Sequence, residues 1–201
     1  MTLSAAPGKQ QAKSLRARDL ICDATIDLLV RKGYSDTSLN QVAATAGFSK
    51  GALQHHYPSK EDLIAATLNK LLARPFQPGR GKPVSVDAAL LQAWNKYINT
   101  PAYRALLEIL NAARTDELLQ ARISTELFDW GRALDAQSLA QYAAVSGNDE
   151  EVVMLLNMTR SFLRGLLIQE RYGSDGVKHL EYVKKWIALV APLLTLRESS
   201  E

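Results

Sequence analysis

The sequence is poor in the residues that disulfide-bonded and metal-binding proteins need. Its 201 residues include one cysteine, Cys22, and three histidines. A single cysteine excludes an internal disulfide framework and favours a reducing compartment. Because Cys22 lies next to Ile21 in an apolar helical pattern, we interpret it as a small buried side chain rather than a reactive thiol.

Long apolar runs are absent too. No stretch reaches the roughly eighteen consecutive apolar residues of a membrane helix, and the opening segment, MTLSAAPGKQQAK, lacks the apolar core of a signal peptide. The apolar fraction of 47% is nevertheless ordinary for a folded domain. We therefore expect a cytoplasmic protein that does not enter the membrane.

The sequence also lacks the motifs of common enzyme classes. It holds no P-loop, no strand followed by G-x-G-x-x-G, no G-x-S-x-G and no H-E-x-x-H. His55 and His56 are adjacent, so on a helix they point in different directions and cannot clamp one metal ion as an i, i+4 pair does. His179 stands alone and is expected at the surface or an interface. We expect no metal, cofactor or catalytic residue; the alternatives are a bundle enzyme with Glu108 or Glu126 as base, and a helical protein-binding scaffold.

The most informative stretch is 38–57, SLNQVAATAGFSKGALQHHY. Ser38 and Gln41 have the spacing of a capping box at the start of a helix. Gly47 ends that helix, because glycine takes the left-handed conformation that lets the chain turn at once into the next helix. Ser49 is placed to cap this second helix.

The second helix separates an apolar face from faces with small, polar and basic side chains. Leu53 and Tyr57 are spaced i, i+4 and are expected to point inward. The other faces then carry Lys50, Gly51, Ala52, Gln54, His55 and His56. A supporting helix, a tight turn and a helix that exposes donors form the helix-turn-helix that fits the DNA major groove. An ordinary helical hairpin in a bundle also contains two short helices, so the flanking residues are needed to distinguish it from a DNA-binding helix-turn-helix.

Those flanks carry further motifs in a fixed order. They are Gly33-Tyr34, Thr37-Ser38, Val42-Ala43, the run GFSKGAL over 47–53, His56-Tyr57 and the run SKEDL over 59–63. This series, within residues 16–63, is similar to the DNA-binding domain of the TetR family of bacterial transcription regulators. The chain departs from the family at Gln54, where tyrosine is usual. Glutamine can still reach adenine N6 and N7, so the departure concerns the operator sequence more than DNA binding itself.

The resemblance implies a set of DNA contacts and a dimer. It assigns DNA binding to Ser38, Ser49, Lys50, Gly51, Ala52, Gln54, His55, His56, Tyr57 and Lys60. In the family, the position of Lys60 contacts the DNA backbone and lies at the start of the helix that connects the DNA-binding domain to the C-terminal domain. The family also pairs through its last two long helices, holds an effector cavity among its middle helices, and most often represses.

Positive charge is concentrated in the same part of the chain. Residues 1–60 carry a net charge of +4, whereas residues 61–201 carry −1. Neutralising phosphates is the sequence-independent part of DNA affinity, so this asymmetry is the sign expected of a reader domain. A solvated charged face would also account for an excess of this size.

Composition divides the chain into segments. We expect a disordered basic arm over 1–13, a helix-turn-helix domain over 14–60 that begins with a long helix, a connecting helix over 61–74, and an effector-binding and dimerisation domain over 84–197. The segment 75–83, PFQPGRGKP, cannot continue a helix and separates the last two.

Beyond this boundary every segment has helical periodicity. The expected helices span 86–98, 102–114, 116–145, 150–172 and 177–194, and no strand-like alternation is present. The predicted fold is therefore all-α, with an N-terminal three-helix DNA-binding domain and a C-terminal helical bundle for ligand binding and dimerisation.

The final helix carries two neighbouring apolar stripes, although one would satisfy a core within the chain. We therefore predict a homodimer formed by the last two helices. The expected interface residues are Leu156, Leu163, Tyr182, Trp186, Leu189 and Leu193. The alternative is a monomer in which the last helix is wholly buried.

Aromatic and polar residues on the middle helices are the candidates for an effector pocket. The predicted ligand contacts are Trp94, Tyr97, Leu107, Leu110, Asn111, Arg114, Phe128, Met158 and Phe162, and Tyr103, Trp130, Arg160 and Arg164 are further candidates. Buried arginine would favour a carboxylate, while aromatic residues at this spacing also form ordinary core.

Together these features indicate a ligand-responsive, sequence-specific transcriptional regulator. We expect a repressor that a small molecule releases from a palindromic site on double-stranded DNA by shifting the connecting helix. The alternative is a helical ligand- or protein-binding module, or a bundle enzyme, that has lost specific DNA reading.

Overall fold

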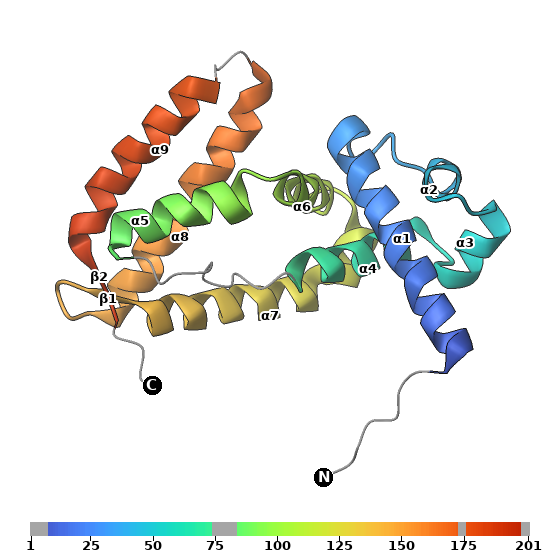
Figure 1. Ribbon diagram of the computed structural model, residues 1–201, viewed down its shortest axis with the longest axis horizontal. Coiled ribbons are helices and arrows are strands. Elements are labelled where there is room, and N and C mark those ends of the chain that lie inside the picture. The colour runs from blue at the N-terminus through green and yellow to red at the C-terminus, as the bar shows by residue number, and fades with distance from the viewer. Residues whose placement is uncertain (1–7, 74–83, 173–175, 198–201) are drawn as a thin grey trace, which may run out of the picture. The chain divides into compact units, whose positions relative to one another are not determined.

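The computed structural model describes residues 8–73, 84–172 and 176–197 (Figure 1). The α-helices are α1 (Lys9–Lys32), α2 (Leu39–Ala46), α3 (Lys50–His56), α4 (Lys60–Leu72), α5 (Val86–Ala93), α6 (Pro101–Ala112), α7 (Glu117–Gln141), α8 (Asp149–Gln169) and α9 (Gly176–Val190). A π-helical turn η1 (Trp94–Ile98), two 3₁₀ turns, η2 (Glu170–Tyr172) and η3 (Ala191–Leu193), and strands β1 (Tyr142–Ala144) and β2 (Leu194–Leu196) complete these elements. The predicted all-α class is confirmed. None of the helices in the described ranges is both long enough and apolar enough to cross a membrane.

The chain forms two compact units. The described part of the first contains residues 8–73 and 104–124, and that of the second contains 84–103 and 125–197. Residues 104–124 therefore group with the N-terminal helices, although the sequence pattern places them in the segment 84–197. Helices α6 and α7 contribute residues to both units.

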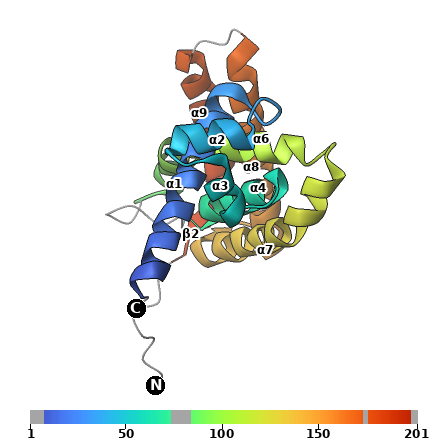
Figure 2. The ribbon, with the colours of Figure 1, turned by 90° about the vertical axis from the view of Figure 1, so that its right-hand side faces the viewer.

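Local capping fixes both helices of the helix-turn-helix, which faces the viewer in Figure 2. The Ser38 Oγ accepts a hydrogen bond from the Gln41 N–H at 3.4 Å, and the Gln41 Oε1 accepts one from the Ser38 N–H at 3.1 Å. Gly47 has a φ of 75°, and its N–H donates to carbonyl oxygens of the last turn of α2. The Ser49 Oγ accepts from the Ala52 N–H at 3.2 Å at the start of α3. The predicted capping box, left-handed turn and second cap are confirmed.

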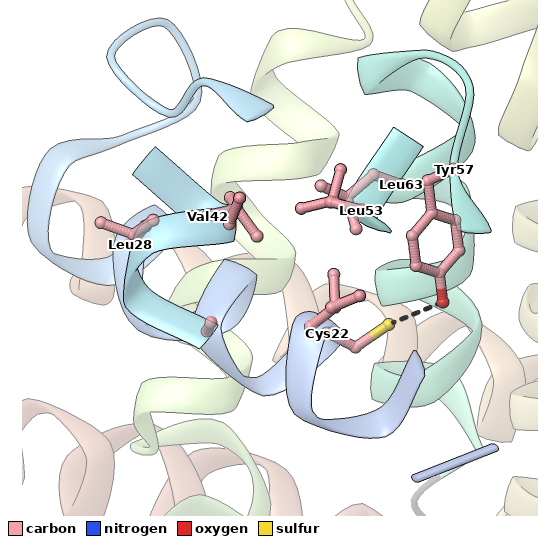
Figure 3. Close-up of a cluster of buried hydrophobic side chains, with 9 residues drawn as sticks. Cys22, Leu28, Val42, Leu53, Tyr57 and Leu63 are labelled. Atoms are coloured by element: carbon pink, nitrogen blue, oxygen red, sulfur yellow. Dashed lines mark hydrogen bonds between the residues drawn. The ribbon is translucent and has the colours of Figure 1, made fainter. Parts of the chain in front are cut away.

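The first unit is held together by a small apolar core between α1, α2, α3 and α4. Figure 3 shows Leu28, Val42, Leu53 and Leu63 converging on one another, and each of them is buried. Cys22 is buried as predicted, and its Sγ lies 3.5 Å from the Tyr57 Oη. Burying each large aliphatic side chain contributes about 1.5–3 kcal/mol, so this cluster stabilises the packing of α3 within the first unit.

The second unit packs α8 against α9 and η1, and α5 against α9. Figure 1 shows α8 and α9 running side by side. Strands β1 and β2 pair antiparallel with Ala143 opposite Thr195, and they join the end of α7 to the end of α9.

Two expectations about secondary structure are corrected. Helix α1 begins at Lys9, because the Ala12 N–H already donates to the Gly8 carbonyl and the run KQQAK consists of good helix formers; residues 9–13 are therefore not disordered. The helices expected over 116–145 and 177–194 end earlier, at Gln141 and Val190. β1 follows α7 directly, whereas η3 and then β2 follow α9, and both three-residue strands are too short to show alternation in the sequence. The predicted boundary 75–83 lies outside the described residues.

The left-handed turn at Gly47 generates a stability prediction. Nothing lies within 4 Å of a Cβ built there, so Gly47→Ala strains only the backbone and should lower the free energy of unfolding by about 1 kcal/mol. The control is Gly131→Ala within α7, where the Cβ also meets open space and where alanine should raise that free energy by about 0.5–1 kcal/mol. Urea denaturation measures both. Unchanged stability in Gly47→Ala would contradict the role of this turn.

Candidate DNA-binding face and ligand cavity

Helix α3 presents its polar face to solvent because its apolar face is fixed in the core. Leu53 is 0% exposed and Tyr57 is 5% exposed, as their i, i+4 spacing predicts. The residues on the outer faces are Lys50, Gly51, Ala52, Gln54 and His55, all exposed, and His56, which is half-buried. Ser38 and Ser49 are also exposed. This surface combines a cation, two amide or imidazole side chains and two small residues that allow close approach to a base edge.

Tyr57 and Lys60 do not belong to this exposed surface. Burial raises the pKa of the Tyr57 hydroxyl, and the ring is part of the core, so the side chain is not available to DNA in this structure. The Lys60 Nζ donates to the Tyr34 carbonyl oxygen at 2.7 Å and lies 3.9 Å from the centroid of the Tyr34 ring. Burial lowers the pKa of Lys60. The lysine is thus engaged inside the first unit, and its phosphate contact stays a prediction.

The first turns of α1 extend the exposed surface of α3. Gln10, Lys13 and Ser14 line an open hollow together with His55 and His56. Burial and then the nearby Arg18 lower the pKa of His56, which favours the neutral imidazole, the form that offers one donor and one acceptor. None of the residues of α1 that line this hollow is among the DNA contacts assigned by the resemblance, and residues 9–13 were expected to be disordered rather than helical.

A second set of contacts ties α4 and the first turn of α7 together within the first unit. The Tyr34 hydroxyl donates to the Asp116 Oδ2 at 2.8 Å, while the Asp116 Oδ1 accepts from the Leu119 N–H at 2.9 Å. Both hydrogen bonds lower the pKa of Asp116, and the one from the Leu119 N–H has the larger effect. The Arg122 Nε lies 3.0 Å from the Asp62 Oδ1 at the start of α4. These links could not be predicted from the sequence, because their partners are far apart in the chain.

The second unit contains a partly open cavity of about 120 Å³. It is lined by Ala89, Leu90, Gln92, Ala93, Tyr97, Ile98, Tyr103, Trp130, Leu134, Gln137, Ser138, Gln141, Tyr142, Leu156, Thr159, Arg160 and Leu163. These residues come from α5, η1, the start of α6, the second half of α7, β1 and α8. Burial raises the pKa of the Tyr142 hydroxyl to about 12, so it is a neutral hydroxyl in the cavity wall.

Four of the residues considered from the sequence line this cavity: Tyr97, Tyr103, Trp130 and Arg160. The other predicted contacts lie elsewhere: Leu107, Leu110, Asn111 and Arg114 in the first unit, Trp94 buried beside the cavity lining, Phe128 and Met158 exposed, and Phe162 stacked on Trp186 at 4.8 Å. Residue type alone could not separate the two groups, because both contain aromatic, apolar and basic side chains.

The surface of α8 and α9 differs from the predicted interface in two residues. Leu156 and Leu163 are only 5% and 3% exposed and line the cavity, so they offer no surface to a second subunit. The exposed apolar side chains on these helices are Met154, Met158, Ile168, Leu180, Tyr182 and Leu189, continued by Leu193 in η3. Trp186 is half-buried and donates from Nε1 to the Thr159 Oγ1 at 3.0 Å. His179 is buried, so its expected place at the surface is wrong.

Comparisons with known proteins agree with this architecture. Residues 21–67 match the family model described as bacterial regulatory proteins, tetR family. The HTH-type transcriptional regulator BetI of Escherichia coli O139:H28 is 25% identical over 183 residues, and the match covers 75% of this chain and 93% of BetI. Residues 21–67 therefore form a DNA-binding domain of the tetR type. Together these matches indicate a DNA-binding transcriptional regulator rather than an enzyme.

Solved structures of TetR-like fold cover nearly the whole chain. A transcriptional regulator from Saccharomonospora viridis, solved in complex with choline, has a TM-score of 0.65 at 15% identity and covers 92% of this chain and 100% of its own. NalD of Pseudomonas aeruginosa, the secondary repressor of the MexAB-OprM multidrug efflux pump, has a TM-score of 0.59 at 18% identity and covers 94% and 100%. At these identities the likeness shows the fold. Within the described residues, no cluster of three or more His, Cys, Asp or Glu side chains could hold a metal ion.

The different surroundings of two lysines generate the prediction for this face. Lys50→Met should weaken binding to every DNA sequence and reduce the slope of log affinity against log salt by about one, with unchanged stability, because Lys50 is exposed and its contact would be to phosphate. Lys60→Met should instead lower the free energy of unfolding by about 1 kcal/mol, because it removes the hydrogen bond to Tyr34. Fluorescence anisotropy at several salt concentrations and urea denaturation distinguish the two. A Lys50→Met variant with an unchanged salt slope would argue against a phosphate contact by this residue.

Proposed function

We propose that a homodimer of this chain represses transcription in the cytoplasm by binding a palindromic operator, and that a small organic molecule in the second-unit cavity releases it. The observation that carries the proposal is the exposed polar face of α3, fixed by the burial of Leu53 and Tyr57. A helix with this character fits the major groove, and Gln54 is its best base reader because glutamine can pair with adenine N6 and N7. Repression is supported by the likeness to NalD, which is a repressor.

A dimer follows from the exposed apolar residues on the last two helices. Tyr182, Leu189 and Leu193 are 50%, 58% and 42% exposed, and Met154 and Met158 are exposed on α8. Large exposed apolar side chains that gather on two neighbouring helices are a common sign of a partner's binding surface. Two-fold pairing would present two α3 helices, and such a pair recognises half-sites separated by about 34 Å, one turn of DNA.

Helix α7 provides a route from the ligand to DNA. Trp130, Leu134 and Ser138 in its second half line the cavity, while Arg122 in its first half pairs with Asp62 at the start of α4. A ligand that favours one position of α7 would therefore bias α4, which follows α3 directly in the chain. The shift requires that the ligand bind one of the two states more tightly.

The first experiment is selection of bound sequences from a random duplex library, with the mass of the protein in solution measured alongside. The proposal predicts enrichment of a palindrome by a dimer. Well-folded protein that enriches no sequence would contradict operator reading and would favour a binding module without specific DNA recognition.

A charge in the apolar face tests the dimer. Leu189→Lys should yield a monomer whose operator affinity is at least about tenfold lower, because each half-site is then bound singly. Leu118→Lys is the matched control, since Leu118 is a 75% exposed leucine on α7 and belongs to the first unit. Analytical ultracentrifugation and operator titration measure both effects. A dimeric Leu189→Lys variant with full affinity would place the interface elsewhere.

A further inference from the structure

The cavity in the second unit has a charged residue in a mostly neutral wall. Among the described residues that line it, Arg160 is the only one with a formal charge. Its side chain is 18% exposed, and burial lowers the pKa of the guanidinium. A cation held in such a place is stabilised by any anion that enters beside it.

The hydrogen bonds of Arg160 leave donors for a ligand. Nη2 donates to the Asp135 Oδ1 at 2.9 Å and to the Asn157 Oδ1 at 2.8 Å, and Nη1 donates to the Ser138 Oγ at 3.3 Å. A guanidinium has five N–H groups, so two of them have no partner among the described residues. The Nη1 edge is the one next to Ser138, which itself lines the cavity.

A second arginine adds to the positive potential. The Arg164 Nε donates to the Tyr103 hydroxyl at 2.8 Å, and its Cζ lies 5.9 Å from the centroid of the Trp130 ring. Both aromatic residues line the cavity. A cationic ligand on the face of the Trp130 ring would compete with Arg164 for that face and would be repelled by the positive charge of Arg160. An anionic ligand would be attracted by both arginines.

Most of the rest of the wall is apolar or aromatic, with Leu90, Ile98 and Leu134 among its members, and neutral polar side chains complete it: Gln92, Gln137, Ser138, Gln141 and Thr159. A buried water needs about 10–15 Å³ by the same measure of volume, so about 120 Å³ holds on the order of ten non-hydrogen atoms. The space therefore suits a compact apolar body with one polar group.

We propose that the effector is a small organic carboxylate, whose carboxylate binds the Nη1 edge of Arg160 and whose apolar body lies against Tyr97, Trp130 and Leu163. This inference rests on the proposed function, because it gives the chemistry of the molecule that occupies the cavity. It differs from a choline-like ligand, with which the Saccharomonospora viridis regulator was solved, in the sign of its charge.

Equilibrium dialysis of the full-length protein with three probes of similar size tests the sign of the charge. Benzoate is negative, benzamide is neutral and phenyltrimethylammonium is positive at pH 7. Benzoate should bind at least about tenfold more tightly than the other two, because its hydrogen bonds to Arg160 are charge-assisted. Tighter binding of phenyltrimethylammonium, or no binding of benzoate at millimolar concentration to protein that melts cooperatively, would overturn the proposal.

Substitutions locate the site. Arg160→Gln should reduce benzoate affinity about tenfold or more and leave that of benzamide nearly unchanged. Asp135→Asn should increase benzoate affinity, because it removes the competing carboxylate from Arg160. Arg160→Gln alone leaves Asp135 without its partner and could fold poorly for that reason. The double variant Arg160→Gln with Asp135→Asn removes both charges of the ion pair, and it should also lose benzoate binding. Arg132→Gln, which removes an exposed cation of α7 outside the cavity lining, is the control and should bind benzoate normally.

Operator titration in the presence of the probes separates the two proposals. Benzoate binding that depends on Arg160 but leaves operator affinity unchanged supports the carboxylate site and contradicts release by ligand. Release of the operator by phenyltrimethylammonium alone supports release and contradicts the carboxylate site. Equal benzoate binding by wild type and Arg160→Gln would place the ligand elsewhere and overturn the inference.

Discussion

The burial of Leu53 and Tyr57 against α1 is the contact on which the DNA-binding face depends. α3 has only seven residues, too few to be stable alone, so its orientation comes from the core and from the caps at Ser49 and Gly47. Once these two side chains are buried, the polar and small residues of α3 have to face solvent. The same packing that stabilises the first unit therefore also determines which side chains can meet a base pair.

The chain uses its long helices to serve both units. α7 contributes its first turns to the first unit, where Asp116 and Arg122 hold Tyr34 and the start of α4, and its later turns to the wall of the cavity. Lys60, at the start of α4, is also held within the first unit, because its amine donates to the Tyr34 carbonyl oxygen. In this account the ligand acts on DNA affinity through the ends of helices, and no extra domain is required.

Helices α2 and α3 could be predicted because the residues that indicate them interact with close neighbours in the sequence. Ser38 with Gln41, Gly47, and the spacing of Leu53 and Tyr57 each depend on neighbours within a few residues, and all three predictions are confirmed. The cavity was not predictable to the same degree. Trp130 lines it and Phe128, two residues earlier on the same helix, is exposed, and this difference depends on how α7 is rotated against α5 and α8. The burial of Leu156 and Leu163, which we predicted at the dimer interface, could not be foreseen for the same reason, because a helix that is apolar on several sides does not reveal which side faces inward.

Hydrogen–deuterium exchange of the full-length protein, with and without its selected operator duplex, tests the central claim most directly. The account predicts that the operator slows exchange in α3 (Lys50–His56) and in the first turns of α1, where the exposed polar surface lies. Slower exchange confined to the second unit, with α3 unchanged, would contradict the assignment of this face to DNA.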